Sequence, residues 1–181
     1  MLRKIAIALC QRFFHQLVTQ KTRSLKRSNT VRYFFFDIDN TLADAWPSFL
    51  VPWPSQNQRV ASLAVFINMR KWVLLLQQFP NNQIFFITAR SYATWRTTRN
   101  WLVENQLSAS WSNTIITNTP DEKLKIIRQI AAHSSRVYWI DDLSYNHERG
   151  TVLYYDQVIE KIKNTSIRYF GVTTINQINQ V

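Results

Sequence analysis

Three runs of apolar residues along the chain each end abruptly in acid or hydroxyl side chains. The first covers Val31 to Phe36, the second covers 84–87 and is followed by Thr88, and the third, 137–140, is followed by two aspartates. A run without polar alternation is typical of a parallel strand that is buried on both faces. Ligands of open parallel sheets bind outside the carboxyl ends of the strands. The polar residues that follow the three runs are therefore predicted to share one edge and to form an active site.

The segments between the runs predict the crossover connections of a parallel sheet. Helical periodicity covers 57–79, 92–106, the residues after Pro120, and 157–163. Further short strands are expected at 114–117, at 152–155 and at 168–172, the last two at the end of the sheet, whereas 176–181 is polar and expected to fray. With 181 residues one domain is expected. The pattern predicts a three-layer α/β fold with a mostly parallel five-stranded sheet and no separate cap domain.

The acids after the first run fit the chemistry of phosphoryl transfer. A carboxylate such as Asp37 accepts a phosphoryl group when a metal and a cation offset the repulsion between two anions. Asp39, two residues on, is spaced to protonate the leaving oxygen and then to deprotonate the attacking water. Hard oxygen ligands of this kind favour Mg²⁺ as the cofactor. Asp141 and Asp142 supply the further carboxylates.

Two more groups are candidates for holding the transferring phosphoryl group, whose oxygens carry the developing charge. Thr88 offers a hydroxyl. If Pro120 opens a helix, Lys123 lies on the stripe that faces the sheet and Lys125 falls on the outer face, so Lys123 is the predicted cation. His147 follows shortly afterwards but is expected at the surface, because no partner histidine stands at ligand spacing.

In their order along the chain, these motifs resemble the haloacid dehalogenase (HAD) superfamily of phosphohydrolases. The resemblance covers residues 31 to about 147 and rests on Asp37-Ile38-Asp39-Asn40-Thr41, Thr88, Lys123 and Asp141-Asp142. It implies a Rossmann-like HAD fold over residues 31–181. It also implies Mg²⁺-dependent hydrolysis of a phosphomonoester through an aspartyl-phosphate on Asp37, with Asp39 as the acid/base.

The same resemblance implies the metal ligands. These are Asp37, the backbone carbonyl of Asp39, and the paired acids. The aligned pattern is an acid followed after three residues by Asp or Asn, as in Asp142 and Asn146, so Asp142 ranks slightly above Asp141 as the direct ligand. The family often has Gly where this chain has Asn40, and Asn is the next most tolerant residue of positive φ.

The resemblance also bears on the substrate, because cap domains enclose small metabolites in this superfamily and little chain remains here for one. Uncapped members tend to act on large substrates or to borrow cover from another subunit. The stretch from Thr88 to Arg90, with 98–102, also resembles locally the phosphatase domain of polynucleotide kinase/phosphatase, which implies nucleic-acid ends. The chain resembles nucleotidases and acid phosphatases as well. A small-molecule phosphatase with no nucleic-acid role therefore remains open.

Several residues are candidates for contacting such a substrate. The proline- and aromatic-rich segment 42–54 is predicted to form a loop or flap over the site, on which Trp46 and Trp53 can stack a base. Arginines in the segment 90–99 can meet backbone phosphates. The candidate substrate-binding residues are Asn40, Thr41, Trp46 and Arg90, with Arg96 and Arg99 beside them.

The first thirty residues differ from the rest in charge. Residues 1–30 contain seven Lys or Arg and no acid, whereas 31–181 contain fifteen basic and eleven acidic residues. Apolar residues recur at helical spacing, which predicts a basic amphipathic helix before a linker at 21–30; they are Leu2, Ile5, Leu9, Phe13 and Leu17. An interfacial helix on anionic lipid, a targeting segment, a nucleic-acid-binding arm and packing against the domain all remain open.

Composition removes several other classes of protein. Cys10 is the single cysteine, which excludes a disulfide framework and a cysteine-rich metal site. Two glycines in the chain exclude a Gly-rich phosphate loop. The apolar core 5–10 is too short to span a bilayer, so a cytoplasmic protein is expected, either free or peripheral to a membrane, with organelle targeting still open. The competing hypothesis is a binding module with a vestigial site that docks through its tail. The oligomeric state is not predicted.

Overall fold

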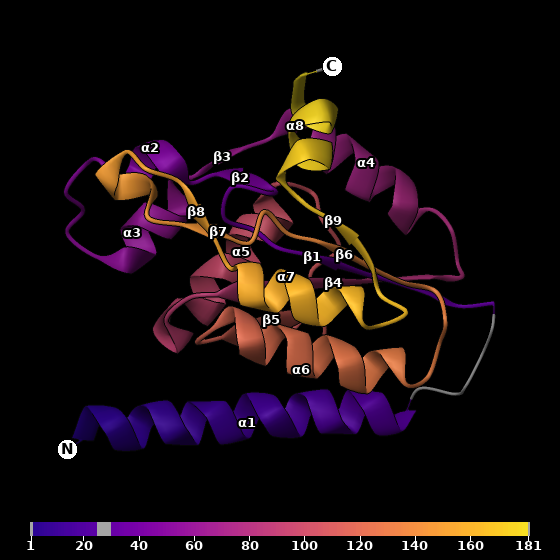
Figure 1. Cartoon of the computed structure of the whole chain (residues 1–181). Coiled ribbons are helices and arrows are strands. Elements are labelled where there is room, and N and C mark those ends of the chain that lie inside the picture. The colour runs from indigo at the N-terminus through magenta and orange to yellow at the C-terminus, as the bar shows by residue number, and fades with distance from the viewer. Residues whose placement is uncertain (1, 25–29, 181) are drawn as a thin grey trace.

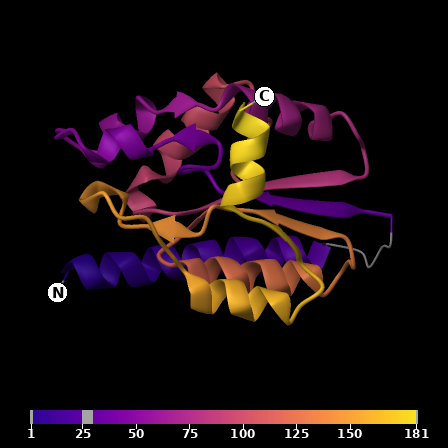
Figure 2. The ribbon, with the colours of Figure 1, turned by 45° about the horizontal axis from the view of Figure 1, so that its top comes forward.

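A five-stranded parallel sheet lies between two layers of helices in the computed structural model, which describes residues 2–24 and 30–180 (Figures 1 and 2). The strands are β1 (Arg32–Phe36), β4 (Asn82–Ala89), β5 (Thr114–Thr117), β6 (Val137–Ile140) and β9 (Arg168–Phe170). Their order across the sheet is β5-β4-β1-β6-β9, and every neighbouring pair is parallel. The predicted three-layer α/β fold is confirmed, with a sheet that is wholly parallel.

Alternate side chains of β1 build the two halves of the core. Phe34 and Phe36 pack on the side covered by α4 (Ile67–Gln77), α5 (Trp95–Glu104) and α8 (Val172–Gln180). Tyr33 and Phe35 pack on the side covered by α6 (Pro120–Ala131) and α7 (Asp156–Lys163). All four side chains are buried, as expected for a strand with helices on both faces.

The register of the sheet brings the polar strand ends together. Phe36, the last residue of β1, pairs with Phe86 of β4 on one side and with Ile140 of β6 on the other. Asp37 therefore follows the central strand at the level where Asp141 follows β6, and its N–H donates to the Ile140 carbonyl at 2.9 Å. The three polar strand ends therefore belong to three adjacent inner strands, β4, β1 and β6.

The predicted helix over 57–79 is wrong, because the chain breaks there into three elements. They are α3 (Gln56–Ala61), β3 (Ala64–Val65) and α4. The break is made by β2 (Ala43–Asp44), which pairs antiparallel with β3, and by the Phe66 N–H, which donates to the Leu42 carbonyl at 2.8 Å. With α2 (Trp46–Phe49), these short elements form a small flap, and no separate cap domain is found among the described residues.

The carboxyl-terminal part differs from the prediction in two places. Strand β8 (Leu153–Tyr154) pairs with β7 (Ser144–Tyr145) in a hairpin of its own and does not join the main sheet. The short 3₁₀ turn η2 (His147–Arg149) lies inside this hairpin. The segment expected to fray belongs to α8, because Ile175 is buried against the core. The remaining turn, η1 (Tyr92–Thr94), begins the predicted helix over 92–106.

The first helix, α1 (Leu2–Ser24), lies along the layer that contains α6 (Figure 1). Phe14 is buried against Tyr92 and Trp95, with ring centroids 5.2 and 4.7 Å away, and Val18 is buried in the core below. Packing against the domain is therefore what the structure shows for this segment. Of the predicted linker, residues 21–24 are helical and 25–29 lie outside the described residues. Within the described part of the chain, no helix combines the length and apolar character needed to cross a membrane.

Candidate active site

One pocket of about 460 Å³ opens at the carboxyl edge of the sheet. Seven of the residues that line it were predicted from the sequence, namely Asp37, Asp39, Asn40, Thr88, Lys123, Asp141 and Asp142. They come from the ends of β1, β4 and β6 and from the first turn of α6. The flap adds Phe49, and the β7–β8 hairpin adds Tyr145 and Arg149.

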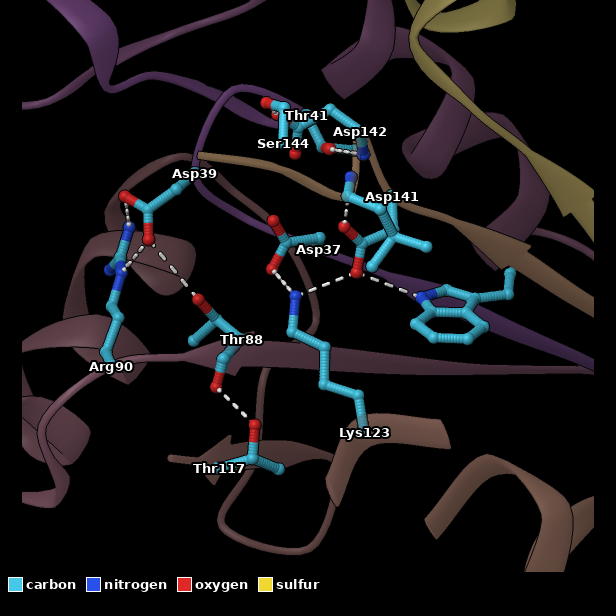
Figure 3. Close-up of polar contacts among 12 residues, drawn as sticks. Asp37, Asp39, Thr41, Thr88, Arg90, Thr117, Lys123, Asp141, Asp142 and Ser144 are labelled. Carbon is cyan, nitrogen blue, oxygen red and sulfur yellow. Dashed lines mark hydrogen bonds and ion pairs between the residues drawn. The ribbon is translucent and has the colours of Figure 1, made fainter. Parts of the chain in front are cut away.

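Lys123 joins two carboxylates at the centre of the pocket (Figure 3). Its Nζ donates to Asp37 Oδ1 and to Asp141 Oδ2, each at 2.7 Å, and all three side chains are buried. Burial opposes the charged form of Lys123, but the two carboxylates outweigh it and raise its pKa. Thr119 caps α6 by accepting from the Glu122 N–H, so the lysine extends from a fixed first turn. As the helical spacing predicts, Lys123 faces inward and Lys125 is exposed.

Three carboxylates in the pocket are close enough to hold one metal ion. Asp37, Asp141 and Asp142 each bring an oxygen within 4.8 Å of the others. Burial, and then the charge of Asp141, raises the pKa of Asp37 well above its usual value and that of Asp142 to about 7. Lys123 offsets only part of this negative charge. An all-oxygen set with excess negative charge fits Mg²⁺.

The two adjacent aspartates differ in how their oxygens are used. Asp141 accepts from Lys123 and from Trp139 Nε1 at 3.0 Å through Oδ2, and from the Leu143 N–H at 2.9 Å through Oδ1. Asp142 accepts from the Ser144 hydroxyl, and its Oδ2 lies 3.9 Å from His147 Nε2. Asp141 thus has both oxygens engaged by the protein, which favours Asp142 as the direct metal ligand.

Asp39 points away from this cluster and toward Arg90 (Figure 3). Arg90 Nε and Nη2 donate to its two oxygens at 2.5 and 2.7 Å, and Thr88 Oγ1 donates to Oδ2 at 3.3 Å. Burial works against the ionised form of Asp39, but the charge and hydrogen bonds of Arg90 hold its pKa below the usual value. Arg90 also donates to Thr98 and is buried, so its guanidinium is committed to positioning Asp39.

Of the other three predicted substrate-binding residues, Thr41, Trp46 and Asn40, only Asn40 lines the pocket. Thr41 is buried, and its hydroxyl accepts from the Asp142 N–H at 3.3 Å. Trp46 contacts the ring of His147 at 5.4 Å between centroids, and Phe49, three residues on, is the flap aromatic that lines the pocket. Asn40 does line it, and its φ of 56° is the positive value at which Asn substitutes for Gly.

The remaining aromatic and basic candidates lie outside this pocket. Trp53 donates through Nε1 to the Ser48 carbonyl at 2.8 Å. Arg99 lies over the Trp111 ring at 4.9 Å from its centroid, and Arg96 is exposed on α5. None of the three is among the residues that line the 460 Å³ pocket.

Sequence reasoning missed two residues at the site. The prediction of a surface position for His147 is wrong, because its Nε2 lies 2.6 Å from Ser144 Oγ and 3.2 Å from Asn40 Nδ2. The η2 turn returns the chain to the pocket, and the positive φ of Asn146 is the local signal for that turn. Arg59 of α3 lines a groove of about 660 Å³ that shares Asp39 and Phe49 with the pocket. Arg59 reaches this groove because the helix expected over 57–79 is broken at 62–66, which the sequence pattern did not predict.

Comparisons with known proteins place the fold. The sequence matches no family model and no curated protein. Among solved structures, it is similar to the Pnkp1/Rnl/Hen1 RNA repair complex, with a TM-score of 0.53 and 14% identity over 82% of this chain. It spans 46% of that protein's chain, about half its length. It is also similar to the class C acid phosphatase from Bacillus anthracis with tungstate bound, with a TM-score of 0.50 and 15% identity over 93% of this chain and 78% of the other. The chain therefore has a Rossmann-like HAD fold.

Proposed function

We propose that the chain is a Mg²⁺-dependent phosphomonoester hydrolase that acts through an aspartyl-phosphate on Asp37. The observation that carries the proposal is the contact of Asp37 with Lys123 at 2.7 Å, inside a pocket where Asp141 and Asp142 complete a three-carboxylate cluster. The fold shared with a class C acid phosphatase supports it. A binding module with a vestigial site has no need to hold so many like charges in a buried position, because such crowding is unfavourable.

The first step requires a nucleophile and a proton for the leaving group. One oxygen of Asp37 is held by Lys123, and the other points away from it (Figure 3). A carboxylate oxygen of Asp37 attacks phosphorus as the bond to the leaving oxygen breaks, and protonated Asp39 gives its proton to that oxygen. Arg90 holds Asp39 ionised in this structure, so Asp39 takes up a proton and turns from Arg90 before this step.

The second step releases inorganic phosphate. Asp39, now ionised, takes a proton from a water that attacks phosphorus, and the bond between phosphorus and Asp37 breaks. The bidentate pair with Arg90 fits this stage, because it favours the ionised form of Asp39. Lys123 Nζ and Thr88 Oγ1 line the pocket as donors for the phosphoryl oxygens.

The donor set around Asp37 fits a magnesium ion. Asp37, Asp142 and the backbone carbonyl of Asp39 are the proposed ligands, with Asp141 holding Lys123 in place. When bound, Mg²⁺ neutralises the negative charge of the cluster and of the substrate phosphate. The fit rests on the oxygen-only donors and on the raised pKa of both Asp37 and Asp142.

The substrate is proposed to be larger than a free metabolite, because the pocket continues into the groove lined by Arg59, with which it shares Asp39 and Phe49. A nucleic-acid end is a candidate, since Arg59 offers a cation for a backbone phosphate. The arginine that the sequence assigned to this task, Arg90, is engaged with Asp39 and Thr98.

The test is Mg²⁺-dependent phosphate release from a panel of phosphomonoesters, among them a 3′-phosphorylated oligonucleotide and a nucleotide. Asp37→Asn removes the nucleophile and is expected to abolish release, whereas Asp121→Asn, an exposed acid on α6, is the matched control. Circular dichroism checks that both variants fold. Release retained by folded Asp37→Asn would refute the mechanism. Preference for the oligonucleotide supports end repair, and preference for the nucleotide supports a small-molecule enzyme.

A further inference from the structure

Three segments around the catalytic opening expose large apolar side chains, and we call them together the apolar rim. The flap contributes Phe49, Leu50, Val51 and Trp53. The β7–β8 hairpin contributes Tyr145, Val152, Leu153 and Tyr154, and α1 contributes Ile5, Leu9 and Phe13. Large apolar side chains that are exposed together at one opening are typical of an interaction site, because exposed apolar residues are otherwise scattered singly.

The rim borders the catalytic pocket itself. Phe49 and Tyr145 line the pocket, and Cys10, next to Leu9, lines the adjoining groove together with Asp39. In Figures 1 and 2 the loop between α2 and α3, the β7–β8 hairpin and the N-terminal end of α1 all project at the left end of the molecule. This is the end at which β1, β4 and β6 deliver their polar residues. Whatever covers the rim therefore faces the catalytic carboxylates.

Helix α1 presents apolar residues on two opposite sides. Phe14 and Val18 are buried against the domain. Ile5, Leu9 and Phe13 stand four residues apart and remain about half exposed, so they form a stripe that the docking of the helix leaves uncovered. Three residues of the stripe predicted from the sequence are thus exposed, although the Phe13 ring still contacts Trp95 at 5.4 Å between centroids, while Phe14 and Val18 are the pair buried against the domain.

The charge around the rim selects an anionic partner. Three of the seven Lys or Arg in residues 1–30 lie in the N-terminal half of α1, namely Arg3, Lys4 and Arg12, and residues 43–66, which contain the whole flap, carry Arg59 and one acid, Asp44. The hairpin carries Arg149, which is exposed at the pocket, and one acid, Glu148, so the N-terminal half of α1 gives the three segments their net positive charge. A surface that combines basic charge with exposed aliphatic and aromatic side chains matches the interface of an anionic bilayer, where apolar groups enter the acyl boundary and cations meet the headgroups.

The aliphatic part of the rim distinguishes a bilayer from a nucleic acid. Single-stranded nucleic acid is bound by aromatic platforms that stack the bases. Leu50, Leu9, Val51 and Ile5 offer no such platform, and they are the four most exposed residues of the rim. Inserted into lipid, the same residues bury apolar area that water otherwise covers.

From this placement we propose that the rim docks face-on to an anionic lipid surface and that the pocket receives a phosphomonoester carried by a lipid headgroup. The choice of a lipid substrate rests on the proposed hydrolase activity, whereas the docking surface is argued from the residues of the apolar rim alone. The uncapped pocket then receives its cover from the bilayer. The flap, the hairpin and α1 meet the lipid together, because they project at one end of the molecule.

The test of docking compares two leucines of similar exposure. Leu50 on the flap is 60% exposed and Leu75 on α4 is 51% exposed. The full chain is sedimented with phosphatidylcholine vesicles that contain or lack phosphatidylserine. We expect binding only with phosphatidylserine, a loss of about tenfold in partitioning for Leu50→Glu and for Leu9→Glu, and no change for Leu75→Glu. Equal binding by Leu50→Glu and Leu75→Glu overturns the proposal, and so does a wild-type chain that stays with the supernatant.

The test of the substrate uses phosphatidic acid embedded in vesicles beside its water-soluble short-chain form. We expect Leu50→Glu to lower the ratio of vesicle to soluble hydrolysis by about tenfold. Soluble hydrolysis that survives Asp37→Asn refutes the hydrolase mechanism and leaves the docking result intact. Soluble hydrolysis without vesicle binding refutes the docking and leaves the hydrolase intact. Binding of a single-stranded oligonucleotide that Leu50→Glu weakens, in place of vesicle binding, overturns the lipid proposal in favour of nucleic acid.

Discussion

Replacing Lys123 by Met tests how the buried carboxylates are held together. Lys123 Nζ lies 2.7 Å from both Asp37 and Asp141, and both acids are buried. Met keeps most of the side-chain volume but leaves the two carboxylates without their shared counter-charge. Removing one partner of a buried ion pair costs about 3–5 kcal/mol, a large share of a typical free energy of unfolding of about 5–15 kcal/mol.

The assay is urea unfolding with a chelator present, so that no divalent ion replaces the lost charge. With an m-value of about 2 kcal/mol per molar urea, the midpoint of Lys123→Met is expected to fall by about 1.5–2.5 M. Lys125→Met is the matched control, because it removes the same charge from the exposed face of the same helix. Its midpoint is expected to move little, in keeping with surface substitutions of about 0.5 kcal/mol or less.

Two comparisons test whether the buried ammonium of Lys123 stabilises the cluster. If Lys123→Met and Lys125→Met unfold at the same urea concentration, the buried ammonium is not what stabilises the cluster, and the argument fails. A second variant covers the case in which Lys123→Met does not fold. Lys123→Met/Asp141→Asn removes one of the two opposed carboxylates, so it is expected to recover part of the lost stability.

Three further predictions concern the metal, the acid/base and the first helix. Chelation is expected to abolish phosphate release and added Mg²⁺ to restore it, whereas activity that persists in excess chelator would contradict the magnesium site. Arg90→Lys removes the bidentate contact with Asp39 and is expected to lower kcat by about tenfold or more. This loss is part of the total rate gain of about 10²- to 10⁴-fold that a general acid/base contributes. Arg96→Lys, on the exposed side of α5, is the control. Phe14→Ala is expected to release α1, seen as loss of hydrogen-exchange protection in that helix, whereas exposed His15→Ala leaves it docked.

The candidate catalytic edge was predictable because each strand that forms it carries its own signal. Asp37 and Asp141 directly follow apolar runs, and the parallel sheet brings such strand ends to one edge. Lys123 was predictable from the helical stripe that begins at Pro120. In each case a short local pattern was sufficient to place the side chain.

The surroundings of the site were not predictable in the same way. His147 reaches Asn40 only because a hairpin folds back over the edge, a contact between segments far apart in sequence. The helix predicted over 57–79 is interrupted between α3 and α4, because the Phe66 N–H donates to the Leu42 carbonyl and this bond competes with helical periodicity. The side of α1 that meets the domain depends on the rings of Tyr92 and Trp95. A helical wheel of α1 alone does not contain that information.

The inner strands and the inserted segments have different tasks, because the strands place the proposed reacting groups and the inserts border the opening. The reacting groups follow β1, β4 and β6, whereas the segments that border the opening lie at 43–66 and 144–155, with α1 outside both. Each insert begins and ends beside the edge of the sheet. Exchanging either one for a loop of different chemistry therefore changes what reaches Asp37 without moving Asp37 itself. The fold is in this respect a ready scaffold for redirecting the proposed hydrolase from one kind of molecule to another.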